Sequence, residues 1–226
     1  MMAPTNLRKP VVAGQFYPDK KEELKDLIAS FVGKTVHKTD VLGAILPHAG
    51  YVYSGRVAVE TVSGINIKDT VVLLGPNHTD LGSTFSIMPQ GTWQTPLGNV
   101  EVDARLAKLF LEKSKYLEAD LIAHLNEHSL EVQLPILQFF RSNFKIVPIA
   151  LKTDNLSMLT EVAQNIADVI SENNLQSSVL FIASSDMTHY ESLANAKKKD
   201  ALAIEAIVAL DEQKLDAVVK EFDISM

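Results

Sequence analysis

The sequence predicts an α/β fold, with a mainly parallel or mixed central sheet and helices on both faces. Short apolar runs that read as buried strands alternate with longer segments whose apolar residues recur at helical spacing. The chain has 226 residues, of which 46% are apolar, so it can bury a sizeable core. This length suits one large domain or two small ones, and we expect the single domain, over residues 1–226.

Four apolar runs are predicted as buried strands: residues 41–46, 70–74, 144–151 and 178–183. A shorter strand is expected at residues 85–88, and a hairpin at 93–102 around the turn signal of residues 96–99. Helices are expected at residues 54–65, 103–112, 129–140, 154–172, 193–210 and 212–222, and after residue 19, where Asp19 can act as a cap. Pro135 would kink the helix at 129–140 unless that helix begins late.

Composition excludes several classes of function. The net charge of −7 and pI of about 5.4 argue against a nucleic-acid surface. The absence of cysteine excludes disulfides, thiolate catalysis and cysteine zinc sites from the chain as given. No apolar run reaches the length of a membrane span or forms a signal peptide, so we expect a cytoplasmic protein without membrane attachment. No phosphate-binding glycine loop or nucleophile elbow occurs.

Histidines follow three of the predicted strands. His48 follows the first and His78 the second, while Asp186 and His189 follow the fourth. Because the carboxyl ends of parallel strands share one edge of a sheet, these loops are expected to converge. Imidazoles and a carboxylate can hold Zn, Fe or Cu, and a further histidine can act as a general base.

Each of these residues also has a purely structural interpretation. A lone histidine after a strand is more often a loop or capping residue, and Asp186 can cap a helical turn. Glu127 and His128 precede a predicted helix, where capping is favoured over a role in orienting ligands. Tyr51 and Tyr53 suit core packing as well as the wall of a pocket.

Five motifs, taken together and in order, resemble the Memo family, whose prokaryotic members are often labelled AmmeMemoRadiSam system protein B. They are AGQFYP at residues 13–18, PHAGYVYSG at 47–55, GPNH at 75–78, EHS at 127–129 and SSDMTHY at 184–190. The matches run over nearly the whole chain.

The resemblance implies a fold similar to the LigB-type class III extradiol dioxygenases, which use non-haem Fe(II) held by two histidines and a glutamate. In the Memo pattern the two histidines persist, here as His48 and His78, and a cysteine replaces the glutamate. Asp186 and His189 match further polar residues of the same cleft, with His189 favoured as a base. The family label also implies a link to radical-SAM and AMMECR-type proteins.

This chain ends at Met226, before the position of the family's cysteine. We therefore expect the domain to lack its C-terminal segment and to bind a divalent metal (Fe, Zn or Cu) more weakly than a longer relative.

The predicted site combines these assignments. His48 and His78 are the metal ligands; the catalytic candidates are His189, Asp186 and His128; the cleft candidates are Tyr51, Tyr53, Asn77 and Glu127. The function expected first is metal-dependent redox or oxygen chemistry on a small molecule. The alternative is a non-enzymatic scaffold whose cleft holds a peptide or protein partner. A zinc-dependent hydrolase is a third interpretation, for which no motif is present.

Overall fold

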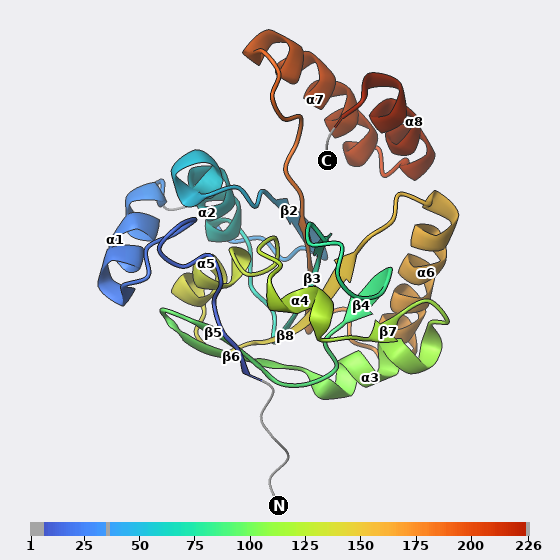
Figure 1. Ribbon diagram of the computed structural model, residues 1–226, viewed down its shortest axis with the longest axis horizontal. Coiled ribbons are helices and arrows are strands. Elements are labelled where there is room, and N and C mark those ends of the chain that lie inside the picture. The colour runs from blue at the N-terminus through green and yellow to red at the C-terminus, as the bar shows by residue number, and fades with distance from the viewer. Residues whose placement is uncertain (1–6, 35–36, 225–226) are drawn as a thin grey trace, which may run out of the picture. The chain divides into compact units, whose positions relative to one another are not determined.

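A computed structural model describes residues 7–34 and 37–224 of the chain (Figure 1). The chain divides into two compact units, which meet in sequence between Ser184 and Ser185 and are described separately below. The prediction of one domain over residues 1–226 stays a prediction.

Within the described residues, the first unit contains a sheet of nine strands. Seven of them follow the order β1-β5-β6-β8-β3-β9-β2; of the other two, β4 pairs with β8, and β7 pairs with β4. The strands are β1 Leu7–Arg8, β2 Gly43–Leu46, β3 Thr70–Pro76, β4 Phe85–Ile87, β5 Thr92–Thr95, β6 Gly98–Val102, β7 Glu118–Ala119, β8 Lys145–Leu151 and β9 Val179–Ser184. The helices of this unit are α1 Lys21–Phe31, η1 Tyr51–Gly55, α2 Arg56–Ser63, α3 Ala104–Lys113, α4 Ile122–Leu125, α5 Gln133–Phe140 and α6 Leu156–Glu172.

The centre of the sheet is parallel. Strands β2, β9, β3 and β8 run side by side in the same direction, with Leu46 opposite Ser184 and Leu73 opposite both Ile182 and Pro148. The predicted hairpin forms as β5 and β6, which pair antiparallel, and β4 is antiparallel to β8. The predicted fold class, an α/β protein with a mainly parallel or mixed sheet, is confirmed.

Helices cover both faces of the sheet, as Figure 1 shows. One core joins α1, α2 and α5 to the sheet and includes Val71 and Leu73 of β3. The other joins α3 and α6 to the sheet and includes Val72, whose side chain points the opposite way because strand residues alternate between faces. Strand β3 is therefore buried on both faces, which explains its unbroken apolar run.

Three helix starts differ from expectation. The helix expected from residue 54 is a π-helical turn, η1, that begins at Tyr51 and continues into α2. Helix α5 begins only at Gln133, which places Pro135 in the first turn, where its missing N–H costs no helical hydrogen bond. Helix α1 begins at Lys21 after Lys20, which makes no side-chain cap, so Asp19 does not have the capping role expected of it.

The second unit, residues 185–226, holds α7 Leu193–Val208 and α8 Glu212–Phe222. Ser192 and Asp211 cap the two helices through their side chains, and Ala203, Val218 and Ile224 form a small core. No helix in the described part of either unit is both long and apolar enough to cross a membrane.

Candidate metal site

Two histidines meet at the carboxyl edge of the parallel strands. His48 lies just after β2 and His78 just after β3, and these two strands flank β9. Because all three strands are parallel, their carboxyl ends lie at one edge, and the rings of His48 and His78 lie 5.2 Å apart between centroids. The predicted convergence of these two loops is therefore observed.

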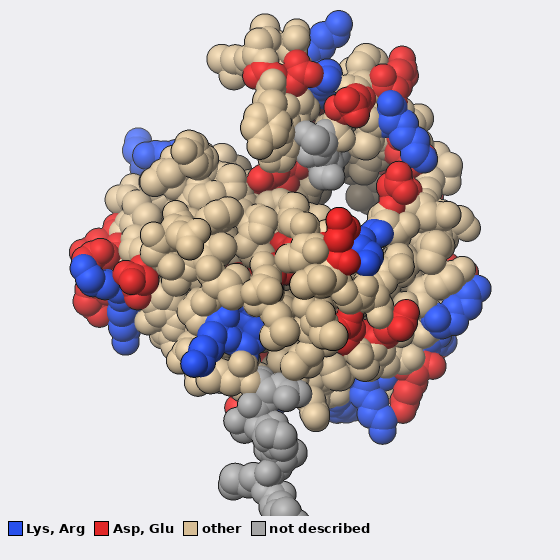
Figure 2. All heavy atoms as spheres, viewed as in Figure 1, with Lys and Arg blue, Asp and Glu red and all other residues tan. Residues whose placement is uncertain are grey.

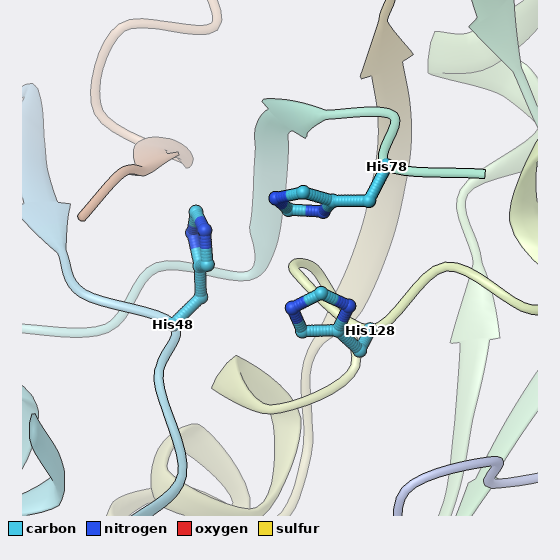
Figure 3. Close-up of side chains that lie close together, drawn as sticks. All are labelled: His48, His78 and His128. Carbon is cyan, nitrogen blue, oxygen red and sulfur yellow. The ribbon is translucent and has the colours of Figure 1, made fainter. Parts of the chain in front are cut away.

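His128 adds a third imidazole to this pair. It lies in the loop between α4 and α5, and its ring centroid is 4.5 Å from that of His78 and 5.8 Å from that of His48. One ring nitrogen of each histidine lies within 4.8 Å of the other two, and Figure 3 shows the three rings directed toward one another. His48 is buried, whereas the side chains of His78 and His128 are 43% and 22% exposed, so the cluster opens on their side.

Glu127 holds His78 from behind. This buried carboxylate lies 2.8 Å from His78 Nδ1 and accepts hydrogen bonds from the His78 backbone N–H at 2.5 Å and from the Ser129 N–H at 2.8 Å. Burial by itself would raise the pKa of Glu127, but the hydrogen bonds from His78 and Ser129 lower the pKa to about 2. Glu127 is therefore ionised at neutral pH.

Ser184, the last residue of β9, holds His48. Its Oγ lies 3.1 Å from His48 Nδ1 and donates a hydrogen bond to the Ser129 carbonyl at 2.7 Å. Gln133 donates from Nε2 to the same Oγ at 2.9 Å and to the Pro47 carbonyl at 3.0 Å. The helix that begins at Gln133 is thus tied to the loop that carries His48.

A buried ion pair fixes the loop that carries Glu127 and His128. The Arg8 guanidinium pairs with Glu131 and donates hydrogen bonds to the carbonyl oxygens of His124 at 3.0 Å and Glu127 at 2.6 Å. Glu131 also accepts from the Tyr17 hydroxyl at 2.5 Å. Residues far apart in the sequence therefore hold this loop beside the histidines.

The cluster fits a divalent transition metal. Imidazole nitrogens are favoured ligands of Zn, Cu, Fe and Ni. Two nitrogens on one ion lie at most about 4.2 Å apart, twice the usual metal–nitrogen bond length. The three nitrogens, all within 4.8 Å of one another, lie close to that range.

The cleft candidates take different positions. Tyr51 is buried and donates from its hydroxyl to the Val132 carbonyl at 2.6 Å, while Tyr53 is 86% exposed. The Asn77 side chain holds the turn that follows β3. Its Oδ1 accepts from the Thr79 N–H at 3.0 Å, and its Nδ2 donates to the Leu81 carbonyl at 2.7 Å. Tyr51 and Asn77 thus have structural partners, and Tyr53 presents its ring at the surface.

Asp186 and His189 belong to the second unit. Asp186 Oδ2 lies 3.5 Å from His189 Nε2, and the Thr188 N–H donates to Asp200 at 3.1 Å. Their assignment to the site of the three histidines stays a prediction.

Several residues behind the histidines were not predicted from the sequence. Ser129 and Ser184 lie inside the motifs EHS and SSDMTHY, so these motifs were an available signal for them. The pair of Arg8 and Glu131 left no local signal, because its members are 123 positions apart and neither charge has a periodic or motif context.

Comparison with known proteins gives consistent matches over most of the chain. The family model of Memo-like proteins matches residues 8–226. A MEMO1 family protein of Methanopyrus kandleri is 42% identical over 233 residues, which cover 97% of this chain and 82% of that protein. Another from Methanosarcina mazei is 45% identical over 207 residues, covering 91% of this chain and 76% of the relative. One from Thermotoga neapolitana is 39% identical over 235 residues, covering 97% and 84%.

Proposed function

Because the chain belongs to the Memo-like family, we propose that it works through a divalent metal ion held by His48, His78 and His128. The observation that carries this proposal is the grouping of one nitrogen from each ring within 4.8 Å. Iron, zinc and copper all suit such a donor set. Bound iron or copper would supply redox or oxygen chemistry on a small molecule.

The protein's own residues would bind the ion, leave one side of it open and place a negative charge beside it. His48 is buried and would anchor the metal on the sheet side, while His78 and His128 line the open side, where a small molecule can approach. Glu127 carries a negative charge beside both of these rings, at 2.8 Å from His78 Nδ1 and 3.5 Å from His128 Nδ1. That charge offsets part of the positive charge of a bound cation.

The proposal retains the roles that the sequence suggests for the second unit. His189 would move a proton, and Asp186 would complete the site. Replacing either residue by Ala would then lower turnover of a small-molecule substrate while metal binding by the three histidines persists. The predicted association with radical-SAM and AMMECR-type proteins, in a cytoplasmic setting, belongs to the same proposal and is testable by co-purification.

A non-enzymatic scaffold is the second candidate. The observation that favours it is the exposure of two apolar side chains directly after the His48 loop, Val52 at 76% and Tyr53 at 86%. Exposed apolar side chains of this kind suit a contact with a peptide or protein partner.

Metal titration tests the proposal directly. Zn²⁺, anaerobic Fe²⁺ and Cu²⁺ are titrated into wild-type protein, His48→Ala, His78→Ala and the exposed control His37→Ala. We expect one site per chain, with at least a 10–100-fold loss of affinity in the first two variants and none in the control. Unchanged affinity in both His48→Ala and His78→Ala would refute the metal site. Oxygen uptake with catechols then separates the enzyme from the scaffold.

A further inference from the structure

We propose that Ser184 and Glu127 are positioning residues that set His48 and His78 in the same tautomer, with the proton on Nδ1 and the lone pair on Nε2. This inference rests on the proposed metal function, since it states which nitrogen of each ring meets the ion. It follows from counting the hydrogen atoms that each partner can give and receive.

The tautomer of His48 follows from the bonds of Ser184. A serine hydroxyl has one hydrogen atom to donate. Ser184 gives it to the Ser129 carbonyl at 2.7 Å, because a carbonyl oxygen can only accept. Toward His48 Nδ1, at 3.1 Å, the Ser184 oxygen can then only accept. His48 Nδ1 therefore carries the proton, and the neutral ring has its lone pair on Nε2.

Gln133 reinforces this direction. Its Nε2 donates to Ser184 Oγ at 2.9 Å, so the serine oxygen receives two hydrogen bonds and gives one. Three partners thus saturate the hydroxyl, and all of these atoms are buried. A rotation of the hydroxyl hydrogen toward His48 would leave the buried Ser129 carbonyl without this bond, which is costly.

The tautomer of His78 follows from Glu127. Both carboxylate oxygens of Glu127 accept from a backbone N–H, Oε1 from Ser129 at 2.8 Å and Oε2 from His78, and a carboxylate that accepts at both oxygens has no hydrogen atom to donate. Its Oε1 lies 2.8 Å from His78 Nδ1, and its Oε2 is occupied by the His78 backbone N–H. His78 Nδ1 therefore also carries the proton, and Figure 3 shows this ring directing a nitrogen toward His48.

Ser129 links the two arrangements. Its N–H donates to Glu127, its carbonyl receives the Ser184 hydrogen, and its own hydroxyl donates to the Pro76 carbonyl at 2.9 Å, near the end of β3. One fully buried residue thus joins the partner of His78 to the partner of His48. Both ligands would meet a metal through Nε2 without first moving a proton, which prepares the site for the ion.

The test is the tautomer of each ring in metal-free protein, read by long-range ¹H–¹⁵N correlation spectra. In the wild type we expect Nδ1–H at both His48 and His78. Ser184→Ala should give a mixture at His48 and weaken Zn²⁺ binding about 10–100-fold, while Ser184→Thr, which keeps the hydroxyl, restores both. Glu127→Gln should shift His78 toward the Nε2–H tautomer, because the Gln amide can donate to Nδ1, and should weaken Zn²⁺ binding by a similar factor.

The matched control is Ser86→Ala. Ser86 is also fully buried and hydrogen-bonded, to Ser83 and Asp120, so this variant loses a buried hydroxyl without touching the histidines. It should leave both tautomers and the Zn²⁺ affinity unchanged. An Nε2–H tautomer at either ring of the wild type, or equal tautomers in Ser184→Ala and wild type, would overturn the inference. Correct tautomers in a wild type that binds no metal would instead overturn the proposed function.

Discussion

Gly75 shows how closely single residues pack behind the histidines. A Cβ at this position of β3 would lie 2.8 Å from Leu130 Cδ2, 3.0 Å from Ser129 Oγ and 3.3 Å from Ser184 Cβ. The absence of a side chain at Gly75 therefore makes room for Ser184, which contacts His48, and for Ser129, which links Ser184 to Glu127. Replacing Gly75 would push on both at once.

We expect Gly75→Ala to destabilise the fold by about 1–3 kcal/mol, as overpacking in a filled core does, and to weaken metal binding because the serines must shift. Urea unfolding and Zn²⁺ titration measure the two effects. Gly33→Ala is the control, since a Cβ there meets nothing within 4 Å and the change should stay within about 0.5 kcal/mol. Equal stability of the two variants would contradict the packing argument.

His124, in α4, is fully buried, and its ring centroid lies 5.9 Å from that of Trp93. Burial, followed by the positive charge of Arg8, lowers the pKa of His124 from 6.5 to about 4. Below pH 6.5 the unfolded chain therefore takes up a proton at His124 that the folded protein does not. Stability is lost as pH falls from 6.5 toward 4.

A pKa lowered to this extent in the folded protein corresponds to a loss of about 3 kcal/mol in the free energy of unfolding as pH falls from 6.5 to 4. His124→Leu should remove that part of the pH dependence, so the free energy of unfolding should fall by about 3 kcal/mol less in the variant than in the wild type between pH 7 and pH 4. The comparison requires urea unfolding at several pH values. His37→Ala, on the exposed surface, should keep the wild-type slope. A variant whose stability falls as steeply as the wild type between pH 6.5 and 4 would exclude His124 as the source.

At the scale of elements, the short strand β1 and the loop between α4 and α5 stabilise each other. Arg8 of β1 lies with its guanidinium 4.4 Å from the centre of the Trp93 ring and pairs with Glu131. Glu131 also accepts from the backbone N–H groups of Val11 and Val12. A network of hydrogen bonds and one buried ion pair thus connects residues 8–12 to the loop that carries His128.

We expect Arg8→Met to cost about 3–5 kcal/mol, because it leaves the buried Glu131 without its cation and two carbonyl groups without their donor. It should also lower metal affinity, since the loop that bears Glu127 and His128 loses its anchor. Arg105→Met, on an exposed residue, should change stability by no more than about 0.5 kcal/mol. Combining Arg8→Met with Glu131→Gln should cost less than the sum of the separate changes; strict additivity would mean that the pair is not coupled.

The elements that were predicted well are those that carry a local pattern. The strand before His78 and the long helix α6 have apolar residues at the spacing of their own structure. The strand before His48 forms as Gly43–Leu46, but it lies at the end of the strand order and only Leu46 is buried, so the prediction of a buried strand was wrong there. The short elements β1, β7 and α4 were not predicted, because their few residues hold no period and form only through contacts made elsewhere in the chain. Tyr51, where the π-helical turn begins, also has a distant partner, since its hydroxyl donates to the Val132 carbonyl.

At the scale of the whole molecule, strand order decides what the sequence could reveal about the site. His48 and His78 could be paired from sequence because both follow strands, and parallel strands end at one edge. His128 precedes a helix, and its position depends on Glu127 and Arg8, so no rule of strand ends places it beside the other two rings. Over the first unit, the face shown in Figure 2 carries positive and negative side chains along its edges and a broad area without charged side chains between them.

The most direct test of the central claim is the number of imidazoles bound to the metal. X-ray absorption at the zinc edge of Zn²⁺-loaded protein should show three histidine ligands in the wild type and two in His128→Ala. His37→Ala should retain three. Two imidazoles in the wild type, unchanged by His128→Ala, would contradict the account, because His128 would then lie beside the metal site without belonging to it.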